Sequence, residues 1–245
     1  MLRALNLISG ICLLVSLAGC TWLMDIKPRR EGAAIDLSRK GLTEIPDYVF
    51  ENKELKVLRL YGNKLDSIPD RISELENLEK LYLGRNDLKS LPESIGKLKN
   101  LKLLSAQYND IDQLPESIGE MSSLEQIILN QNQLRGLPSS LGKLQRLEVL
   151  QLKFNWLDSL PQSIGSCQSL RFVHLNRNNL DSLPTSMGQL NNLKELYLSN
   201  AGPLLLVPEN FCDLRFLELL EIDGTTALPP CLYVLQANRL RIIQN

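Results

Sequence analysis

The sequence predicts an α/β solenoid, in which stacked rungs place parallel strands in a concave sheet and short helical or 3-10 turns on the convex side. Three observations predict it. A leucine recurs every 23 residues from Leu55 to Leu193, apolar residues hold the same places in each period, and one asparagine and one proline recur at fixed positions. Because no single period could bury its own apolar face, the periods must stack, and both ends need a cap.

Each period opens with a predicted strand. With the recurring leucine as position 1, positions 4 and 6 are apolar, whereas positions 3 and 5 are polar or variable. This alternation is typical of a short strand with one face in the core. About eight such strands, roughly 4.8 Å apart, would give a concave face about 38 Å long, which is enough for a protein partner.

An asparagine follows each strand at position 9, where the chain must bend inward. Its side-chain amide can donate to and accept from backbone groups of its own and adjacent rungs, which could not otherwise reach water. We interpret this column as a structural ladder. Its members are Asn63, Asn86, Asn109, Asn132, Asn155 and Asn178.

A proline at position 15 fixes the backbone on the return side of each rung. An apolar residue and commonly a glycine follow it, which favours a short helical or 3-10 turn on the convex face. The prolines are Pro69, Pro92, Pro115, Pro138, Pro161 and Pro184.

The period that begins at Leu78 reads LEKLYLGRNDLKSLPESIGKLKN. It resembles the 23-residue bacterial and Ras-group type of leucine-rich repeat, with its LPxxIG signature, over about residues 33–238. The resemblance implies a leucine-rich-repeat solenoid, or horseshoe. Proteins with this repeat most often bind partners on the concave strand face.

The chain divides into five segments. Residues 1–19 are a predicted lipoprotein signal peptide, and residues 20–32 a lipidated N-terminus and tether. Residues 33–54 form an N-terminal capping repeat, residues 55–216 the leucine-rich repeats, and residues 217–245 a C-terminal capping repeat and tail.

Both ends of the repeat array depart from the pattern. Lys40 stands where the first rung should have its asparagine, and Ala201 replaces the asparagine of the rung that begins at Leu193. That rung has 24 residues, so the register after about Asn200 is open.

The first 20 residues have the pattern of an export signal. Arg3 precedes a mostly apolar stretch, which ends in Leu-Ala-Gly-Cys at residues 17–20. This tetrad resembles the lipobox of bacterial lipoproteins, which implies that Cys20 carries acyl chains such as palmitate and anchors the protein to a membrane. The alternative is an uncleaved transmembrane anchor, because the apolar stretch approaches the ~20 residues that span a bilayer.

The resemblance to a lipobox implies a location in the cell envelope. In a Gram-negative host, Thr21 beside Cys20 resembles an outer-membrane sorting signal, and the protein could face either the periplasm or the cell surface.

Composition argues against several functions. The formal net charge is −1 and no basic cluster stands out, so we expect no nucleic-acid partner. His174 is the single histidine and cannot build a histidine-based metal site, while Cys167 falls at a core position away from it. We expect no metal, no cofactor and no enzymatic activity.

Cys212 and Cys231 leave two interpretations open. If the extra residue of one rung and the two missing from the next both precede the proline, the two cysteines lie on neighbouring rungs within reach of a disulfide. The alternative is two free thiols. An exported protein permits the disulfide.

The concave face has the candidate binding residues. Its middle is more apolar than a solvated surface requires, aromatic residues surround it, and a tryptophan occupies position 10, where other complete repeats have lysine, aspartate, glutamine or asparagine. Exposed aromatic patches commonly mark interaction sites, although these residues are also good strand formers. The candidates are Tyr82, Leu103, Tyr108, Ile128, Val149, Phe154, Trp156, Phe172, His174 and Tyr197, with Phe154 and Trp156 foremost.

The sequence therefore predicts a monomeric, membrane-anchored module that binds a protein partner through its concave face, as an adhesin or a scaffold. The alternative is recognition of an envelope or host glycan, or of peptidoglycan, with Tyr82, Trp156 and Tyr197 as stacking platforms.

Overall fold

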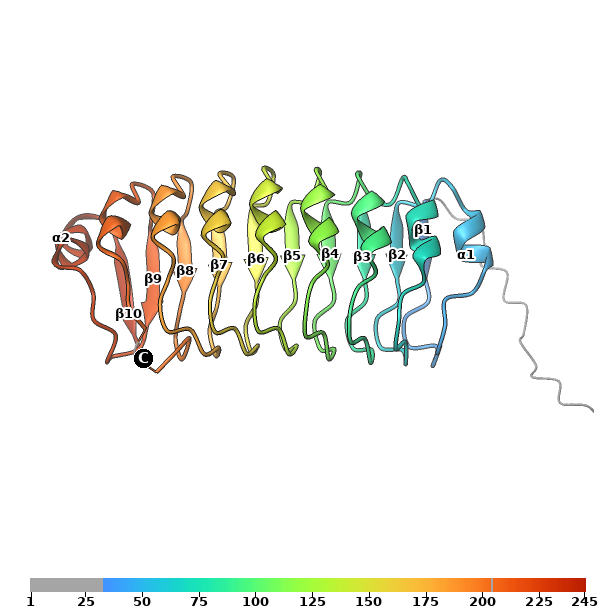
Figure 1. Ribbon diagram of the computed structural model, residues 1–245, viewed down its shortest axis with the longest axis horizontal. Coiled ribbons are helices and arrows are strands. Elements are labelled where there is room, and N and C mark those ends of the chain that lie inside the picture. The colour runs from blue at the N-terminus through green and yellow to red at the C-terminus, as the bar shows by residue number, and fades with distance from the viewer. Residues whose placement is uncertain (1–32, 204) are drawn as a thin grey trace, which may run out of the picture. The chain divides into compact units, whose positions relative to one another are not determined.

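Ten parallel strands form one sheet in chain order, so that each strand pairs with that of the next rung (Figure 1). The computed structural model describes residues 33–203 and 205–245; the expected signal peptide, the tether and Cys20 lie outside them. The strands are β1 (Ala34–Asp36), β2 (Val57–Arg59), β3 (Lys80–Tyr82), β4 (Leu103–Ser105), β5 (Gln126–Ile128), β6 (Val149–Gln151), β7 (Phe172–His174), β8 (Glu195–Tyr197), β9 (Leu219–Ile222) and β10 (Arg241–Gln244).

Short helices occupy the other side of the coil. Seven of them within the described residues are 3-10 helices, as the proline column predicts, and an α-helix lies near each end of the array. They are α1 (Tyr48–Glu51), η1 (Asp70–Glu74), η2 (Glu93–Lys97), η3 (Glu116–Glu120), η4 (Ser139–Lys143), η5 (Gln162–Ser166), η6 (Thr185–Gln189), η7 (Glu209–Asp213) and α2 (Pro230–Asn238).

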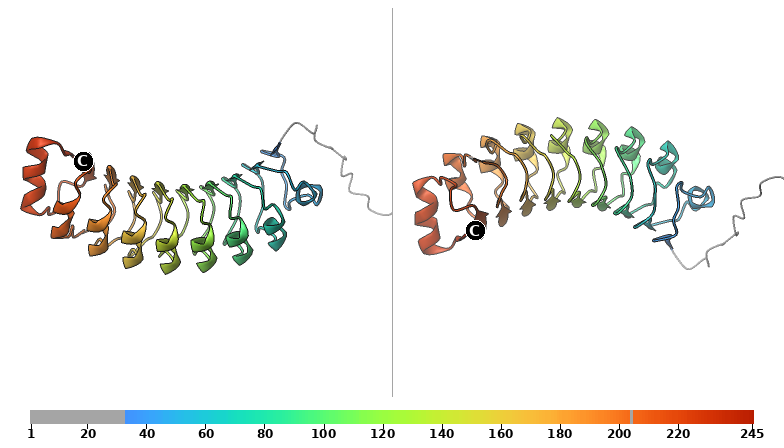
Figure 2. Two further views of the ribbon diagram at one scale, coloured as in Figure 1. Left: turned by 90° about the horizontal axis from the view of Figure 1, so that it is seen from above. Right: turned by 90° about the horizontal axis from the view of Figure 1, so that it is seen from below.

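The strands line the concave side of this repeat unit and the 3-10 helices its convex side, as two further views show (Figure 2). Between the two layers lies a continuous core of buried leucines and isoleucines, one set per rung. A proline with φ between −71° and −65° precedes each 3-10 helix. The glycine that follows packs closely: a Cβ on Gly119 would lie 2.2 Å from the carbonyl oxygen of Ser140.

The asparagine column forms the predicted ladder. Asn132 donates from Nδ2 to the carbonyl oxygens of Ala106 and Leu129, both at 3.0 Å, and its Oδ1 accepts from the backbone N–H of Ile111 at 3.1 Å. The same three bonds recur at the other five asparagines, with Lys40 and Leu42 as the N–H donors at the first. Each rung is thereby tied to the one before it.

A backbone group replaces the missing amide at Ala201. The N–H of Leu180, which a position-9 asparagine would have bonded, donates instead to the carbonyl oxygen of Ala201 at 2.6 Å. The chain can approach this closely because the next residue is glycine: a Cβ on Gly202 would lie 1.7 Å from the carbonyl oxygen of Leu180. The ladder thus ends without an orphaned N–H group at this rung.

The C-terminal segment adds a strand to the sheet. Its last residues form β10, which pairs with β9 and extends the sheet beyond the expected eight strands, as β1 does at the other end. A disulfide joins Cys212 in η7 to Cys231 in α2, with Cα atoms 5.8 Å apart. In residues 33–203 and 205–245, no helix is long and apolar enough to span a membrane.

Candidate partner-binding face

The strand register places every position-3 side chain beside the position-3 side chain of the next rung, and likewise for position 5. The four apolar side chains of the predicted centre are half-buried, but only Val149 and Phe172 are direct neighbours in the register. Gln126 separates Leu103 from Val149 at position 3, and Ile128 stands at position 5 between two polar residues.

Position 8 brings the exposed aromatic residues to the rim where the strands end. Tyr108 and Phe154 expose 42% and 44% of their surface. Both have a left-handed backbone, with φ of 58° and 56°. The same position is Gly62 in an earlier rung, where φ is 72°. A bulky residue in this region costs on the order of 1 kcal/mol or more, so stability does not account for the choice of Tyr and Phe.

Arginines on adjacent rungs cover these rings. The Arg85 guanidinium lies 5.0 Å from the centre of the Tyr108 ring, and that of Arg177 lies 4.9 Å from the centre of the Phe154 ring. Such contacts orient the guanidinium groups and leave their N–H groups free to bond an acceptor.

Trp156 is the most exposed of the candidate residues, at 58%. Its backbone N–H bonds the Leu134 carbonyl oxygen of the preceding rung, so its position is fixed by the ladder while its ring faces solvent. The Arg135 guanidinium lies 5.7 Å from the indole ring. Trp156 thus lies two residues beyond Phe154, in the loop that follows the same strand.

His174 and Tyr197 form a stacked pair on β7 and β8, with ring centroids 4.3 Å apart and an interplanar angle of 7°. Burial, together with the nearby Lys153, lowers the pKa of His174 to about 4. The Tyr197 hydroxyl donates to Glu195 at 2.7 Å, and this bond raises the pKa of the phenol to about 12. Both side chains are therefore engaged with neighbours in the chain.

The remaining candidates are placed as follows. Tyr82 is half-buried on β3, with the Arg59 guanidinium 5.4 Å from its ring centre. Cys167 is fully buried, and burial raises its pKa to about 11. A thiol in the core is therefore not available to His174 on the concave face. No group of three His, Cys, Asp or Glu side chains suited to a metal ion occurs in the described part of the chain.

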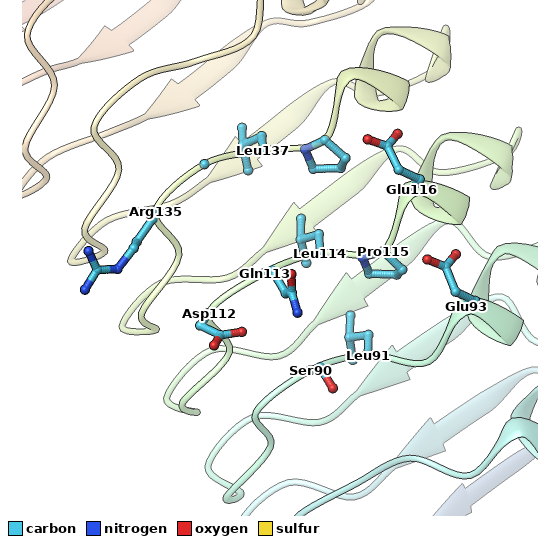
Figure 3. A pocket seen from close by; sticks show the side chains of 12 residues that line it. Ser90, Leu91, Glu93, Asp112, Gln113, Leu114, Pro115, Glu116, Arg135 and Leu137 are labelled. Atoms are coloured by element: carbon cyan, nitrogen blue, oxygen red, sulfur yellow. The ribbon is translucent and has the colours of Figure 1, made fainter.

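A polar hollow of about 770 Å³ lies on the flank of three central rungs (Figure 3). Two of its carboxylates already have structural partners. Glu93 accepts the backbone N–H of Ser117 at 3.1 Å, and Glu116 accepts that of Ser140 at 3.2 Å. These contacts tie η2 to η3 and η3 to η4, so we assign the hollow to the scaffold rather than to a binding site.

The sequence reasoning missed the arginines of the rim. Arg85 and Arg177 were not among the candidates, although position 8 compared across rungs reads Arg, Tyr, Gln, Phe, Arg from Arg85 onward. The aromatic residues of position 8 thus belong to a pattern that includes their charged neighbours.

Comparison with known proteins agrees with the geometry. Residues 46–163 match the family model described as leucine-rich repeat region. No curated protein sequence matches the chain significantly. The fold is a leucine-rich-repeat solenoid, and this fold generally serves as a protein–protein interaction module.

Three solved structures illustrate the similarity. A leucine-rich-repeat protein of Leptospira interrogans is 25% identical (TM-score 0.57); the match covers 88% of this chain and 72% of that one. The leucine-rich repeat domain of the type III effector XopL is 27% identical (TM-score 0.76). That match covers 86% of this chain and 76% of the XopL chain. The plant peptide hormone receptor RGFR1, solved in complex with RGF2, is 27% identical (TM-score 0.60), covering 82% of this chain but 37% of the receptor.

Proposed function

We propose that the protein is a lipoprotein, anchored to a membrane of the cell envelope through acylated Cys20, that binds another protein on its concave face as an adhesin or scaffold. The observation behind the binding function is the exposed aromatic group at the rim. Among residues 33–203, the exposed large apolar side chains are those of Tyr108, Phe154 and Trp156. Aromatic residues of this kind dominate binding energy in protein interfaces.

The structural neighbours support the same function. The plant receptor RGFR1 was solved with RGF2, so a solenoid of this kind can hold a polypeptide ligand. A glycan ligand has less support, because the Tyr197 ring proposed as a stacking platform already stacks on His174.

In vivo cross-linking tests the binding function. Complexes of the tagged full-length chain would be isolated from its own host and quantified by mass spectrometry. We expect Phe154→Ala/Trp156→Ala to lower partner recovery by about tenfold or more, because loss of the two rings together would cost about 2 kcal/mol or more of binding free energy.

The matched control is Leu206→Ala/Phe216→Ala, which also removes two exposed apolar side chains, of 64% and 58% exposure, away from the rim. It should leave recovery unchanged. Equal recovery with the rim variant and with wild type would refute a rim-centred interface.

The anchor has a separate test. An alkyne-labelled fatty acid should label the wild-type chain and fail to label Cys20→Ala, which should also leave the membrane fraction. Labelling that persists in Cys20→Ala would contradict acylation at this residue.

A further inference from the structure

Over its six central rungs the concave face is positively charged, although the chain as a whole is not. The full sequence has 28 acidic and 27 basic residues. In the six rungs that begin at Leu55 and end at Asn192, positions 3, 5, 7 and 8 nevertheless have no aspartate or glutamate. The basic residues at these positions are Arg59, Lys80, Arg85, Lys153 and Arg177.

These five cations form no close ion pairs in the described residues, whereas several cations elsewhere do. None of the ion pairs found in the described residues involves any of the five. By contrast, acids and bases pair at position 2, just before each strand begins. There Lys56 and Lys102 both form ion pairs with Glu79, at 3.0 Å. Acids are therefore available in the sequence, but none occupies position 3, 5, 7 or 8 of these six rungs.

The rim forms a symmetrical row. We call Arg85, Tyr108, Gln131, Phe154 and Arg177 the Arg85–Arg177 rim; all five are exposed and all have φ between 55° and 58°. Each arginine packs on the aromatic ring one rung inside it. Because adjacent strands lie about 4.8 Å apart, the two arginines, four rungs apart, are separated by about 19 Å.

We propose that the Arg85–Arg177 rim binds an extended, acidic segment of a protein partner. An extended chain advances about 3.3 Å per residue, so a segment along the rim would place one carboxylate at each arginine when its two acidic residues are about six positions apart. Each guanidinium can bind a carboxylate with two parallel hydrogen bonds. Apolar residues between the two acids would contact Tyr108 and Phe154. This inference rests on the proposed function and specifies its ligand.

Charges beside the rim disfavour a uniformly anionic polymer such as a nucleic acid or a sulfated glycan. At position 10, in the loops just beyond the rim, lie Asp87 and Asp110. A broad polyanion would meet these carboxylates as well as the arginines. A peptide with two separate acids needs cations only where the rim supplies them.

Peptide selection tests the proposal. A phage library of random 12-residue peptides would be panned on the full-length chain in mild detergent. We expect the enriched peptides to contain two Asp or Glu residues five to seven positions apart, with apolar residues between them. The dissociation constant of one such synthetic peptide would then be measured by fluorescence anisotropy.

Charge reversal of the rim should strongly weaken the binding of this peptide. Arg85→Glu/Arg177→Glu should raise the dissociation constant about 100-fold or more, because each charge-assisted contact is worth about tenfold or more. The control Lys97→Glu/Lys143→Glu makes the same charge change on η2 and η4. The control should change the dissociation constant by about twofold or less, because salt screens charges on the convex side from the rim.

Three outcomes would overturn the proposal. Enriched peptides without acids that depend on Phe154 and Trp156 would refute the acidic ligand and leave the proposed function standing. Heparin or duplex DNA that displaces the peptide and shows the same dependence on Arg85 and Arg177 would indicate a polyanion site. Absence of any enriched peptide would refute a linear segment as ligand, whereas the cross-linking experiment tests the proposed function independently.

Discussion

Replacement of Asn132 by alanine should show how much one ladder asparagine contributes to stability. Asn132 is only 5% exposed, and its amide bonds four backbone groups. Its Nδ2 donates to the carbonyl oxygens of Ala106 and Leu129 at 3.0 Å, and over a longer 3.4 Å to that of Asn130. The carbonyl oxygens of Ala106 and Leu129 each accept a second bond, from Asn109 and Asn155 respectively. They would therefore keep a partner after the substitution. The N–H of Ile111 would lose the one acceptor found for it in the described structure.

The expected loss follows from this inventory. Two amide hydrogen bonds contribute about 1 kcal/mol each, and an orphaned buried N–H costs about 1 to 3 kcal/mol, so Asn132→Ala should lower the free energy of unfolding by about 3 to 5 kcal/mol. Asn191→Ala, at an exposed site on the convex side, should change it by about 0.5 kcal/mol or less.

Urea denaturation followed by circular dichroism would measure both variants under the same conditions. A loss below about 1 kcal/mol for Asn132→Ala would refute the reasoning, because it would mean that Ile111 does not depend on this amide.

Three further predictions concern other parts of the chain. Gly202→Ala should lower the free energy of unfolding by about 3 kcal/mol in a urea titration, because the new Cβ would meet a carbonyl oxygen at 1.7 Å. The control Gly136→Ala has open space around the new Cβ and should be nearly neutral. Reduction of the disulfide between Cys212 and Cys231, 19 residues apart, should cost about 3 kcal/mol; an unchanged melting temperature with reductant would contradict this. The pKa of His174 falls from 6.5 to about 4 on folding, so the unfolded state binds a proton at a higher pH than the folded state does. Wild type should therefore lose stability relative to His174→Phe as the pH falls from 6.5 to 4. Parallel curves of unfolding free energy against pH over that range would disprove the shift.

Much of the fold could be predicted because each repeated position has one physical role. The asparagine at position 9 must satisfy buried backbone groups, and the proline at position 15 sets φ before each 3-10 helix. The prediction was incomplete where the pattern breaks. At Ala201 a backbone carbonyl replaces the amide, which only the contact of Gly202 with Leu180 reveals. Likewise, the rung that leads to β10 has Thr225 at position 9 in place of the asparagine, so the repeat pattern does not announce this strand.

The candidate face could be predicted in outline but not in its details. Period-two alternation identifies Leu103 and Phe172 as concave residues, yet says nothing of how far each is buried. The stacking of His174 on Tyr197 depends on ring orientation, which spacing does not determine. The contact of Arg177 with Phe154 joins side chains 23 residues apart, and it becomes visible only when position 8 is compared across rungs.

Site-specific photo-crosslinking in living cells tests most directly whether the concave rim is the partner-binding surface. A photoreactive amino acid would replace Tyr108, Phe154 or Trp156 at the rim, and Lys97 or Lys143 on the convex side, one position at a time. The account predicts adducts with the same partner at the three rim positions and none at the two convex positions. Adducts with that partner at the convex positions, without any at the rim, would contradict it.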